Sequence, residues 1–381
     1  MADRAEESPG GTGETGEDTT ESVADFPAGR LSRLGGLLYR HRVILGSFGL
    51  VLMTGTILAA LLGGNLAQAL VSGVVIGSIY VLGATGLSLI YAIKKFANFA
   101  HGDLLTLGAY MVFFVNVGVG LNIFFGFVIA IVGMAFVGIL LEILIFRHLE
   151  GRGAIAPLIA SVGVFIIIQN GISAAFGTTP DFYNVARLPN LFFGDPVLVQ
   201  INPIKGVLTF VVAVGATVML HILLSRTTLG KSMRAMADNP DLARASGINT
   251  RNVTLWTWAI SGMLAGLAGG LLALSLDVRP LLGFGILLFL FAAVIIGGIG
   301  SPYGAMVGGF LVGLIQSLSG ILLEWLGRAD TFGLESASAY RPMAAFLAMI
   351  AVLLVKPEGL MGRAGTAGGR GAGLLTRLRR R

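Results

Sequence analysis

Residues Leu121–Phe146 read LNIFFGFVIAIVGMAFVGILLEILIF, and this stretch decides the class of protein. Its only charged residue, Glu142, lies near its C-terminal end. A helix of about 20 apolar residues is long enough to cross ~30 Å of hydrocarbon. We therefore expect this segment to cross a membrane as an α-helix.

Similar apolar runs recur along the chain of 381 residues, of which 55% are hydrophobic and only 12% charged. A soluble domain carries about 25% charged residues. The 56 glycines suit membrane helices, because small residues allow close helix packing. The absence of cysteine excludes disulfides and thiolate metal sites. The sequence predicts an all-α membrane protein, a polytopic helical bundle located in the cell membrane.

We predict eight to ten transmembrane helices from the apolar runs. The ten candidate spans are Val43–Leu62, Leu66–Ile93, Leu104–Val119, Leu121–Phe146, Ile155–Phe176, Ile204–Leu224, Leu255–Leu276, Phe284–Ile299, Ala305–Trp325 and Pro342–Val355. With ten spans, every cluster of Lys and Arg falls on the same side of the membrane. Basic clusters mark the cytoplasmic side, so both termini are expected in the cytoplasm.

The distribution of charge and hydropathy divides the chain into four parts. Residues 1–28 hold many acidic residues and are expected to form a disordered tail. Residues 29–63 are expected to form an extra N-terminal span with a basic flank. Residues 64–363 are expected to form the main transmembrane domain, with a cytoplasmic loop at 226–251. Residues 364–381 are expected to form a basic cytoplasmic tail.

Ionisable residues inside membrane spans are functional candidates, and this chain has few of them. Glu142, His221 and Glu324 all lie near the ends of their spans, and Glu142 can extend toward Arg147. No span carries a central acid, which a proton- or sodium-coupled carrier usually needs. A carrier that works alone is therefore disfavoured.

The segment NFAHGD contributes three polar residues, Asn98, His101 and Asp103. In one interpretation a helix starts at Gly102, so that Asp103 lies in its first turn and interacts with the helix dipole. In the other, these residues belong to a gate or a substrate path. One histidine and one acid are too few for a metal site. No nucleophile with a base is present either, so an enzyme is not expected.

The segment GGIGSPYGAMVGG, Gly297–Gly309, concentrates glycines between two apolar runs. It is either a tight cytoplasmic turn or a broken helix that lines a path, since irregular backbone at membrane depth must be enclosed. Its candidate path residues are Gly298, Gly300, Ser301 and Gly304. Spacings of the GxxxG type also occur, and we expect most of them to serve helix packing. These pairs are Gly73/Gly77, Gly262/Gly266, Gly266/Gly270, Gly304/Gly308 and Gly309/Gly313.

The cytoplasmic loop has clear helix signals. Asn239 can cap a helix whose first position is Pro240, and Gly247 suits the position just after its end. The predicted helix Pro240–Ser246 follows a second short helix, Leu229–Ala237. Two turns are marginal alone in water. The loop is therefore either an ordinary structured loop or a knob that docks into a soluble partner.

Four collinear stretches resemble one family, the permease subunits of branched-chain amino acid ABC importers of the LivH type. They are GLSLIYAIKKFANFAHGDLLTLGAY (Gly86–Tyr110), LGKSMRAMADNPDLARASGINTRNVTLWTWAISGMLAGLAGGLL (Leu229–Leu272), AAVIIGGIGSPYGAMVGGFLVGLI (Ala292–Ile315) and LLVKPEGLMGR (Leu353–Arg363). The resemblance covers about Leu66–Arg363. It implies a permease that takes up branched-chain amino acids; closely similar permeases import urea and short-chain amides.

The resemblance also assigns roles to residues. In this family a cytoplasmic coupling helix follows an EAA-type pattern, which here reads Asp241, Leu242, Ala243, three residues, then Gly247. Asp replaces Glu, and Leu242 replaces the first alanine. With the flanking Arg234 and Ile248, these residues would dock into an ATPase subunit and transmit its closure.

The partners implied are a sister permease of the LivM type, two ABC ATPase subunits, an extracytoplasmic substrate-binding protein and membrane lipids. No nucleic acid is expected, and neither a metal nor a cofactor is expected on this chain, since ATP would bind to the ATPase subunits. The outer loop Gly177–Pro203 is the candidate docking surface for the binding protein.

Overall fold

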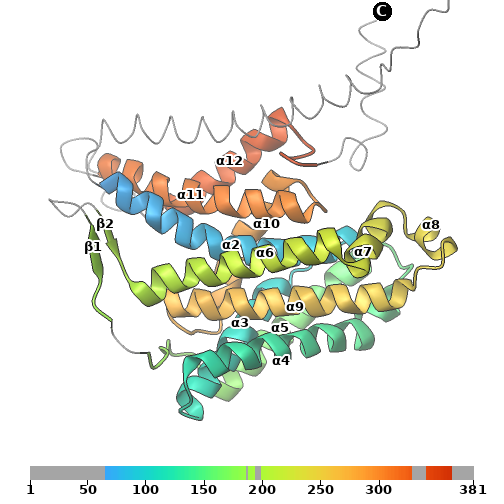
Figure 1. Ribbon diagram of the computed structural model, residues 1–381, viewed down its shortest axis with the longest axis horizontal. Helices are drawn as coiled ribbons and strands as arrows, with labels where there is room; N and C mark the ends of the chain where they lie inside the picture. Colours follow the sequence, from blue (N-terminus) through green and yellow to red (C-terminus); the bar gives the residue numbers. More distant parts are fainter. Residues whose placement is uncertain (1–64, 186–187, 194–198, 328–339, 363–381) are drawn as a thin grey trace, which may run out of the picture. The chain divides into compact units, whose positions relative to one another are not determined.

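The computed structural model describes residues 65–185, 188–193, 199–327 and 340–362 (Figure 1). All of them belong to one compact unit, Met53–Arg381. The predicted acidic tail, the predicted first span Val43–Leu62 and the predicted basic tail 364–381 lie outside the described residues.

The described chain is almost entirely helical. Its α-helices are α2 (Asn65–Lys94), α3 (His101–Phe113), α4 (Ile123–Leu144), α5 (Ile155–Phe176), α6 (Thr209–Arg226), α7 (Thr228–Asp238), α8 (Pro240–Ala245), α9 (Thr250–Ser275), α10 (Leu282–Gly297), α11 (Pro302–Gly327) and α12 (Arg341–Val355). Three short helices of other types adjoin these. The π-helix η1 (Phe114–Gly118) extends α3, and the π-helix η3 (Pro203–Leu208) precedes α6. The 3-10 helix η2 (Phe146–Leu149) follows α4. Strand β1 (Leu191–Phe193) pairs antiparallel with strand β2 (Val199–Ile201).

Each predicted span that falls on described residues coincides with a helix. Within the described part, six helical segments are long and apolar enough to cross a membrane, and α10 and α12 are shorter apolar helices. These findings confirm an all-α membrane protein. The count of eight to ten spans and the cytoplasmic location of both termini remain predictions.

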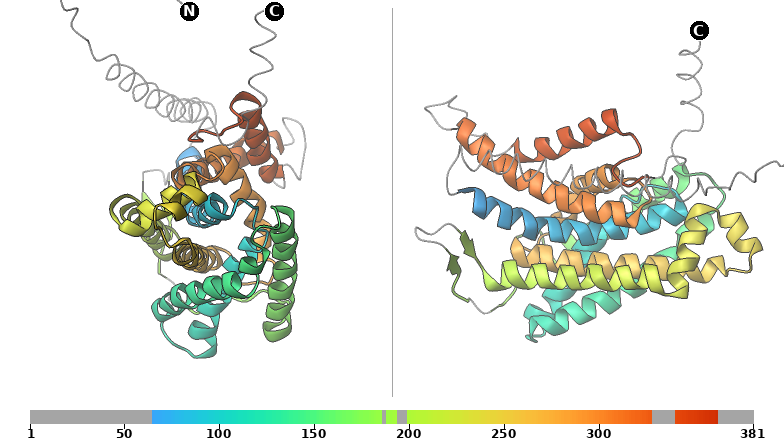
Figure 2. Two further views of the ribbon diagram at one scale, coloured as in Figure 1. Left: turned by 90° about the vertical axis from the view of Figure 1, so that its right-hand side faces the viewer. Right: turned by 45° about the horizontal axis from the view of Figure 1, so that its top comes forward.

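Helices α2 and α9 form the centre of the bundle, and α9 packs against α2, α3 and α4 (Figure 2). In its membrane-length window 94% of α9 is buried and 83% of α2, against 22% for the windows of α4, α5 and α6. The exposed side chains of α4, α5 and α6 are mostly large and apolar. These three helices therefore present surfaces suited to lipid or to other membrane subunits.

The seam between α4 and α9 depends on glycine. A Cβ added at Gly262 would lie 2.1 Å from the carbonyl oxygen of Met134, and one added at Gly138 would lie 2.4 Å from that of Trp258. The backbones of the two helices therefore touch directly. The predicted packing role of the Gly262/Gly266 spacing is confirmed.

Glycines likewise bring α11 against α2 and α10. A Cβ at Gly313 would lie 2.3 Å from Cα of Gly77, and one at Gly308 would lie 1.9 Å from the carbonyl oxygen of Ala293. The glycines of the Gly73/Gly77 spacing in α2 thus face those of the Gly309/Gly313 spacing in α11. Small residues allow this approach, and close approach increases van der Waals contact between the helices.

Candidate functional site

The loop that is predicted to be cytoplasmic folds into two short helices, α7 and α8, which we call the coupling element (Figure 1). Helix α8 has the predicted start: the side chain of Asn239 accepts hydrogen bonds from the amides of Asp241 (3.1 Å) and Leu242 (3.0 Å). Pro240 occupies the first helical position. The predicted preceding helix is α7, which is slightly longer than predicted at both ends.

The end of α8 is equally well defined. Gly247 has a φ of +82° and donates its amide to the carbonyl of Arg244 at 3.1 Å. The amide of Ile248 donates to the carbonyl of Ala243 at 3.1 Å. This pair of bonds is the Schellman ending of a helix, which needs a left-handed residue after the cap. The next residue, Asn249, caps α9 through the amide of Asn252. Helix α8 is therefore joined to the buried α9 by a short, hydrogen-bonded connection.

The predicted coupling residues do not all share one surface. Leu242 is 64% exposed, although it is apolar, and Asp241 and Gly247 are exposed too. Ala243 is buried, and Ile248 is partly buried against the core. The exposed residues form the surface on which a partner could dock, which we call the α8 knob.

Arg234 has a different contact. Its guanidinium donates a hydrogen bond to the carbonyl oxygen of Leu224, at the end of α6. On its inner side α7 buries Met233 and Met236. Arg234 therefore helps to hold the coupling element to α6, and it does not belong to the α8 knob.

The three polar residues of NFAHGD are completely buried. Helix α3 starts at His101, one residue before the predicted Gly102, and Asp103 lies in its first turn as predicted. The Nε2 atom of His101 lies 2.8 Å from the carbonyl oxygen of Gly83 in α2, and Asn98 Oδ1 accepts the amide of Ala100 at 3.2 Å. Two of these residues therefore fix the join between α2 and α3, which supports the structural interpretation. Their role in a gate remains a prediction.

The segment that starts at Gly297 forms a tight turn between α10 and α11. Gly298 and Gly300 have φ values of 116° and 79°, and Ser301 Oγ accepts the amide of Gly304 at 3.1 Å as a helix cap. The segment after α12 packs on this turn. The amides of Leu360 and Met361 donate to the carbonyls of Ile296 and Gly297, each at 2.8 Å. This geometry favours the turn interpretation over a broken helix.

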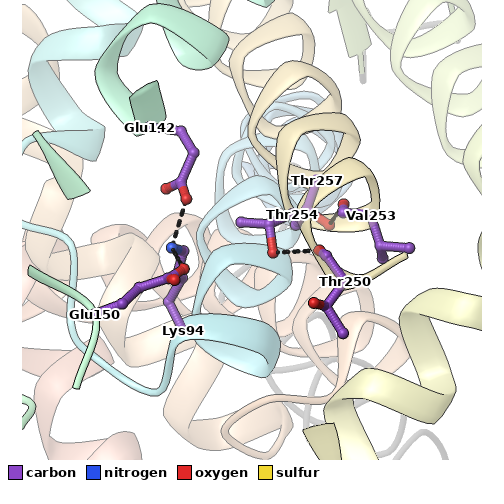
Figure 3. Close-up of polar contacts among 7 residues, drawn as sticks. All are labelled: Lys94, Glu142, Glu150, Thr250, Val253, Thr254 and Thr257. Carbon is purple, nitrogen blue, oxygen red and sulfur yellow. Dashed lines mark hydrogen bonds and ion pairs between the residues drawn. The ribbon is translucent and has the colours of Figure 1, made fainter. Parts of the chain in front are cut away.

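An ion-pair cluster lies at the ends of α2 and α4 (Figure 3). Lys94 Nζ lies 2.6 Å from Glu142 Oε1 and 2.5 Å from Glu150 Oε1. From the sequence, Glu142 was expected only to be able to extend toward Arg147, and the ion pair that the structure shows for Glu142 is with Lys94. The sequence missed the pair with Lys94 because 48 residues separate its members.

Lys95, the next residue, lies just beyond α2. Its Nζ donates to the carbonyl oxygen of Ala237 in α7 at 3.1 Å. Lys95 is exposed overall, but partial desolvation of its ammonium group lowers its pKa from the usual 10.5, and the nearby negative charge of Asp238 acts in the opposite direction.

The loop between α5 and α6, which is predicted to lie on the outer side, contacts the bundle at several points. Asp181 and Val278 exchange two backbone hydrogen bonds of 2.9 and 2.8 Å. The hydroxyl of Tyr183 donates to the carbonyl of Ala109 at 2.9 Å. A cavity of about 450 Å³ lies beside the loop, lined by Asn116, Gly120, Leu121, Asn122, Ile123, Asn184, Val185, Ile204 and Leu208. In the described part of the chain, no group of three or more His, Cys, Asp or Glu side chains could hold a metal ion.

Comparison with known proteins gives a consistent result. Residues 69–355 match the family described as branched-chain amino acid transport system, permease component. The chain is 31% identical over 310 residues to the high-affinity branched-chain amino acid transport system permease protein BraD of Pseudomonas aeruginosa, and 32% identical over 312 residues to LivH of Escherichia coli K12. Each alignment covers 78% of this chain and 95% of the relative.

A third relative is also named as a permease of this type. The probable branched-chain amino acid transport permease protein LivH of Methanocaldococcus jannaschii is 30% identical over 300 residues, which is 76% of this chain and 90% of that protein.

Proposed function

The chain belongs to the family of branched-chain amino acid transport permeases, and we propose that it forms half of the translocation path of an ATP-driven importer for these amino acids. The observation that carries this proposal is similarity along 95% of BraD and LivH, both named as branched-chain amino acid permeases. The protein is a multi-pass membrane protein and a transport component. A permease of this kind works together with ATPase subunits and a substrate-binding protein. The chain itself is expected to need no cofactor.

The α8 knob is the proposed docking site for an ATPase subunit. An apolar side chain such as Leu242, which is 64% exposed, gains stability when a partner groove covers it. The capped start of α8 and its Schellman ending restrict its motion relative to α9. Movement of the knob is therefore transmitted to α9, the most deeply buried of the long helices.

The other subunits complete the proposed assembly. A sister permease of the LivM type would supply the second half of the path, and a second ATPase would dock on it. A substrate-binding protein would deliver its ligand at the outer loop Gly177–Pro203. The gate candidates Asn98, His101, Asp103, Gly298, Gly300, Ser301 and Gly304 would act by holding helix junctions, since most of their described contacts are with backbone groups.

Uptake by the complete transporter tests this function. The chain is reconstituted in liposomes with its sister permease, its ATPases and its binding protein, and uptake of labelled leucine is measured. We expect uptake to require ATP, and we expect excess valine or isoleucine, but not urea or acetamide, to compete. Competition by urea or acetamide would favour the alternative amide importers. Uptake that an ion gradient drives without ATP would favour a secondary carrier.

Leu242→Ala tests the docking site, and here the binding affinity of the ATPase subunit for the reconstituted permease pair is measured. Loss of a central apolar anchor weakens an interface by about 1–2 kcal/mol, so the affinity for the ATPase should fall about ten-fold. The matched control is Leu281→Ala, which also shortens an exposed leucine, but at the outer end beside α10. An equal loss in both variants, or none in Leu242→Ala, would refute docking at α8.

A further inference from the structure

The end of α2 is fixed to α4 by the Lys94 ion-pair cluster. The side chains of Lys94 and Glu142 are only 9% and 3% exposed, whereas Glu150 is 59% exposed. Water screens a buried pair less than an exposed one. The contact with Glu142 therefore holds the two helix ends together more firmly than the contact with Glu150 (Figure 3).

Lys95 links the same end of α2 to the coupling element. Its Nζ reaches the carbonyl oxygen of Ala237, in the last turn of α7. A cation at this position interacts favourably with the negative end of the helix dipole. Among the described residues, Lys95 is the one non-glycine residue with a positive φ, 57°. A left-handed backbone strongly favours glycine. Lys95 nevertheless adopts this conformation, and in it the side chain contacts α7.

The residues after Lys95 lead directly into the buried centre. Phe96 stacks on Phe146 with ring centroids 5.2 Å apart, and Phe146 stacks on Trp258 of α9 at 4.6 Å. The amide of Phe99 donates to Ser161 Oγ of α5 at 3.0 Å. A shift at Lys95 would therefore act on η2, α5 and α9 through these contacts.

We propose that Lys95 is a positioning residue that transmits displacement of the coupling element to α2, while the Lys94–Glu142 pair fixes α2 to α4. Arg234 connects α7 to α6, and Lys95 connects it to α2, so α7 is held to the bundle on two sides. A rigid-body push on the α8 knob then moves the α2–α3 junction together with α9. This inference rests on the proposed function, because it requires an ATPase that docks on α8.

The test compares uptake per ATP hydrolysed in wild type, Lys95→Met and Lys95→Arg, with the complete transporter in liposomes. Lys95→Met removes the link but leaves the α8 knob unchanged, so ATP hydrolysis should continue. Uptake per ATP should fall at least about five-fold, which is the lower range of coupling between sites. Lys95→Arg keeps a cation of similar reach, so uptake per ATP should stay close to that of wild type. The matched control is Lys205→Met, because Lys205 also contacts a main-chain carbonyl, that of Ser275, at the outer end.

The outcomes separate the two claims. If wild type itself shows no ATP-driven uptake, the proposed function fails. If wild type is coupled and Lys95→Met has an unchanged ratio, the inference is wrong. A parallel loss of hydrolysis and uptake would also overturn it, because a merely structural residue would behave in this way. If Lys95→Met does not assemble with the ATPases, Lys95→Gln, which removes the positive charge and shortens the side chain, is measured in its place under the same criteria.

Discussion

Gly262→Ala should weaken the seam between α4 and α9. The new Cβ would lie 2.1 Å from the carbonyl oxygen of Met134, whereas ordinary contacts begin at 3.4 Å. The helices would have to separate by about 1 Å, because the obstacle is backbone that cannot rotate away. Overpacking of this kind costs about 1–3 kcal/mol. We expect a loss of about 2 kcal/mol, and hence, for a chain of this size, a Tm lower by about 2–4 °C.

The assay is thermal melting of the purified protein in detergent. Since the chain contains no cysteine, thiol-reactive dyes are not suitable, and the monodisperse fraction after heating is measured by size-exclusion chromatography. Gly215→Ala is the matched control, because no atom lies within 4 Å of a Cβ built at this position of α6. Alanine favours a helix by about 1 kcal/mol over glycine, so the control should melt at the wild-type temperature or above.

Two results would refute this reasoning. One is a Tm of Gly262→Ala equal to that of wild type, which would mean that α4 and α9 pack less closely than the structure shows. The other is an equal fall in Gly215→Ala, which would mean that glycine matters in these helices for some reason other than contact.

Two further substitutions test the ion-pair cluster and the coupling element. Glu142→Gln removes the charge that faces buried Lys94 and should cost about 2 kcal/mol in melting experiments. Glu150→Gln, in the exposed half of the cluster, should cost less than about 0.5 kcal/mol, and equal costs would contradict the burial argument. Asn239→Ala removes the cap of α8 and should cost about 1 kcal/mol locally. Hydrogen exchange of the α8 amides should then be several-fold faster, and unchanged exchange would show that the cap contributes nothing.

Local signals in the sequence predicted much of the fold. The span Ile155–Phe176 coincides with α5, because apolar content alone defines a membrane helix. The ends of α8 followed from Asn239, Pro240 and Gly247, because caps act within a few residues. Hydropathy placed the start of α9 at Leu255, but the helix starts at Thr250, because Asn249 caps a polar first turn.

Contacts between distant segments could not be predicted. The pair Lys94–Glu142 depends on how α2 and α4 pack, and a nearby residue, Arg147, was the more obvious partner in the sequence. The same holds for the hydrogen bonds from Leu360 and Met361 to the end of α10. Motifs located the coupling element, but only the contact of Arg234 with Leu224 of α6 separated this residue from the α8 knob.

The central claim is that an ATPase subunit binds the α8 knob. Since the chain contains no cysteine, Leu242→Cys creates a single thiol on the α8 knob, and a thiol-to-amine cross-linker is applied to the assembled transporter. Leu276→Cys is the control, because Leu276 is also exposed but lies just after the C-terminal end of α9, whereas α8 precedes the N-terminal end of α9. The account predicts a covalent adduct with the ATPase from position 242 and none from position 276. An adduct from position 276 alone, or from neither position in a complex that still takes up leucine, would contradict it.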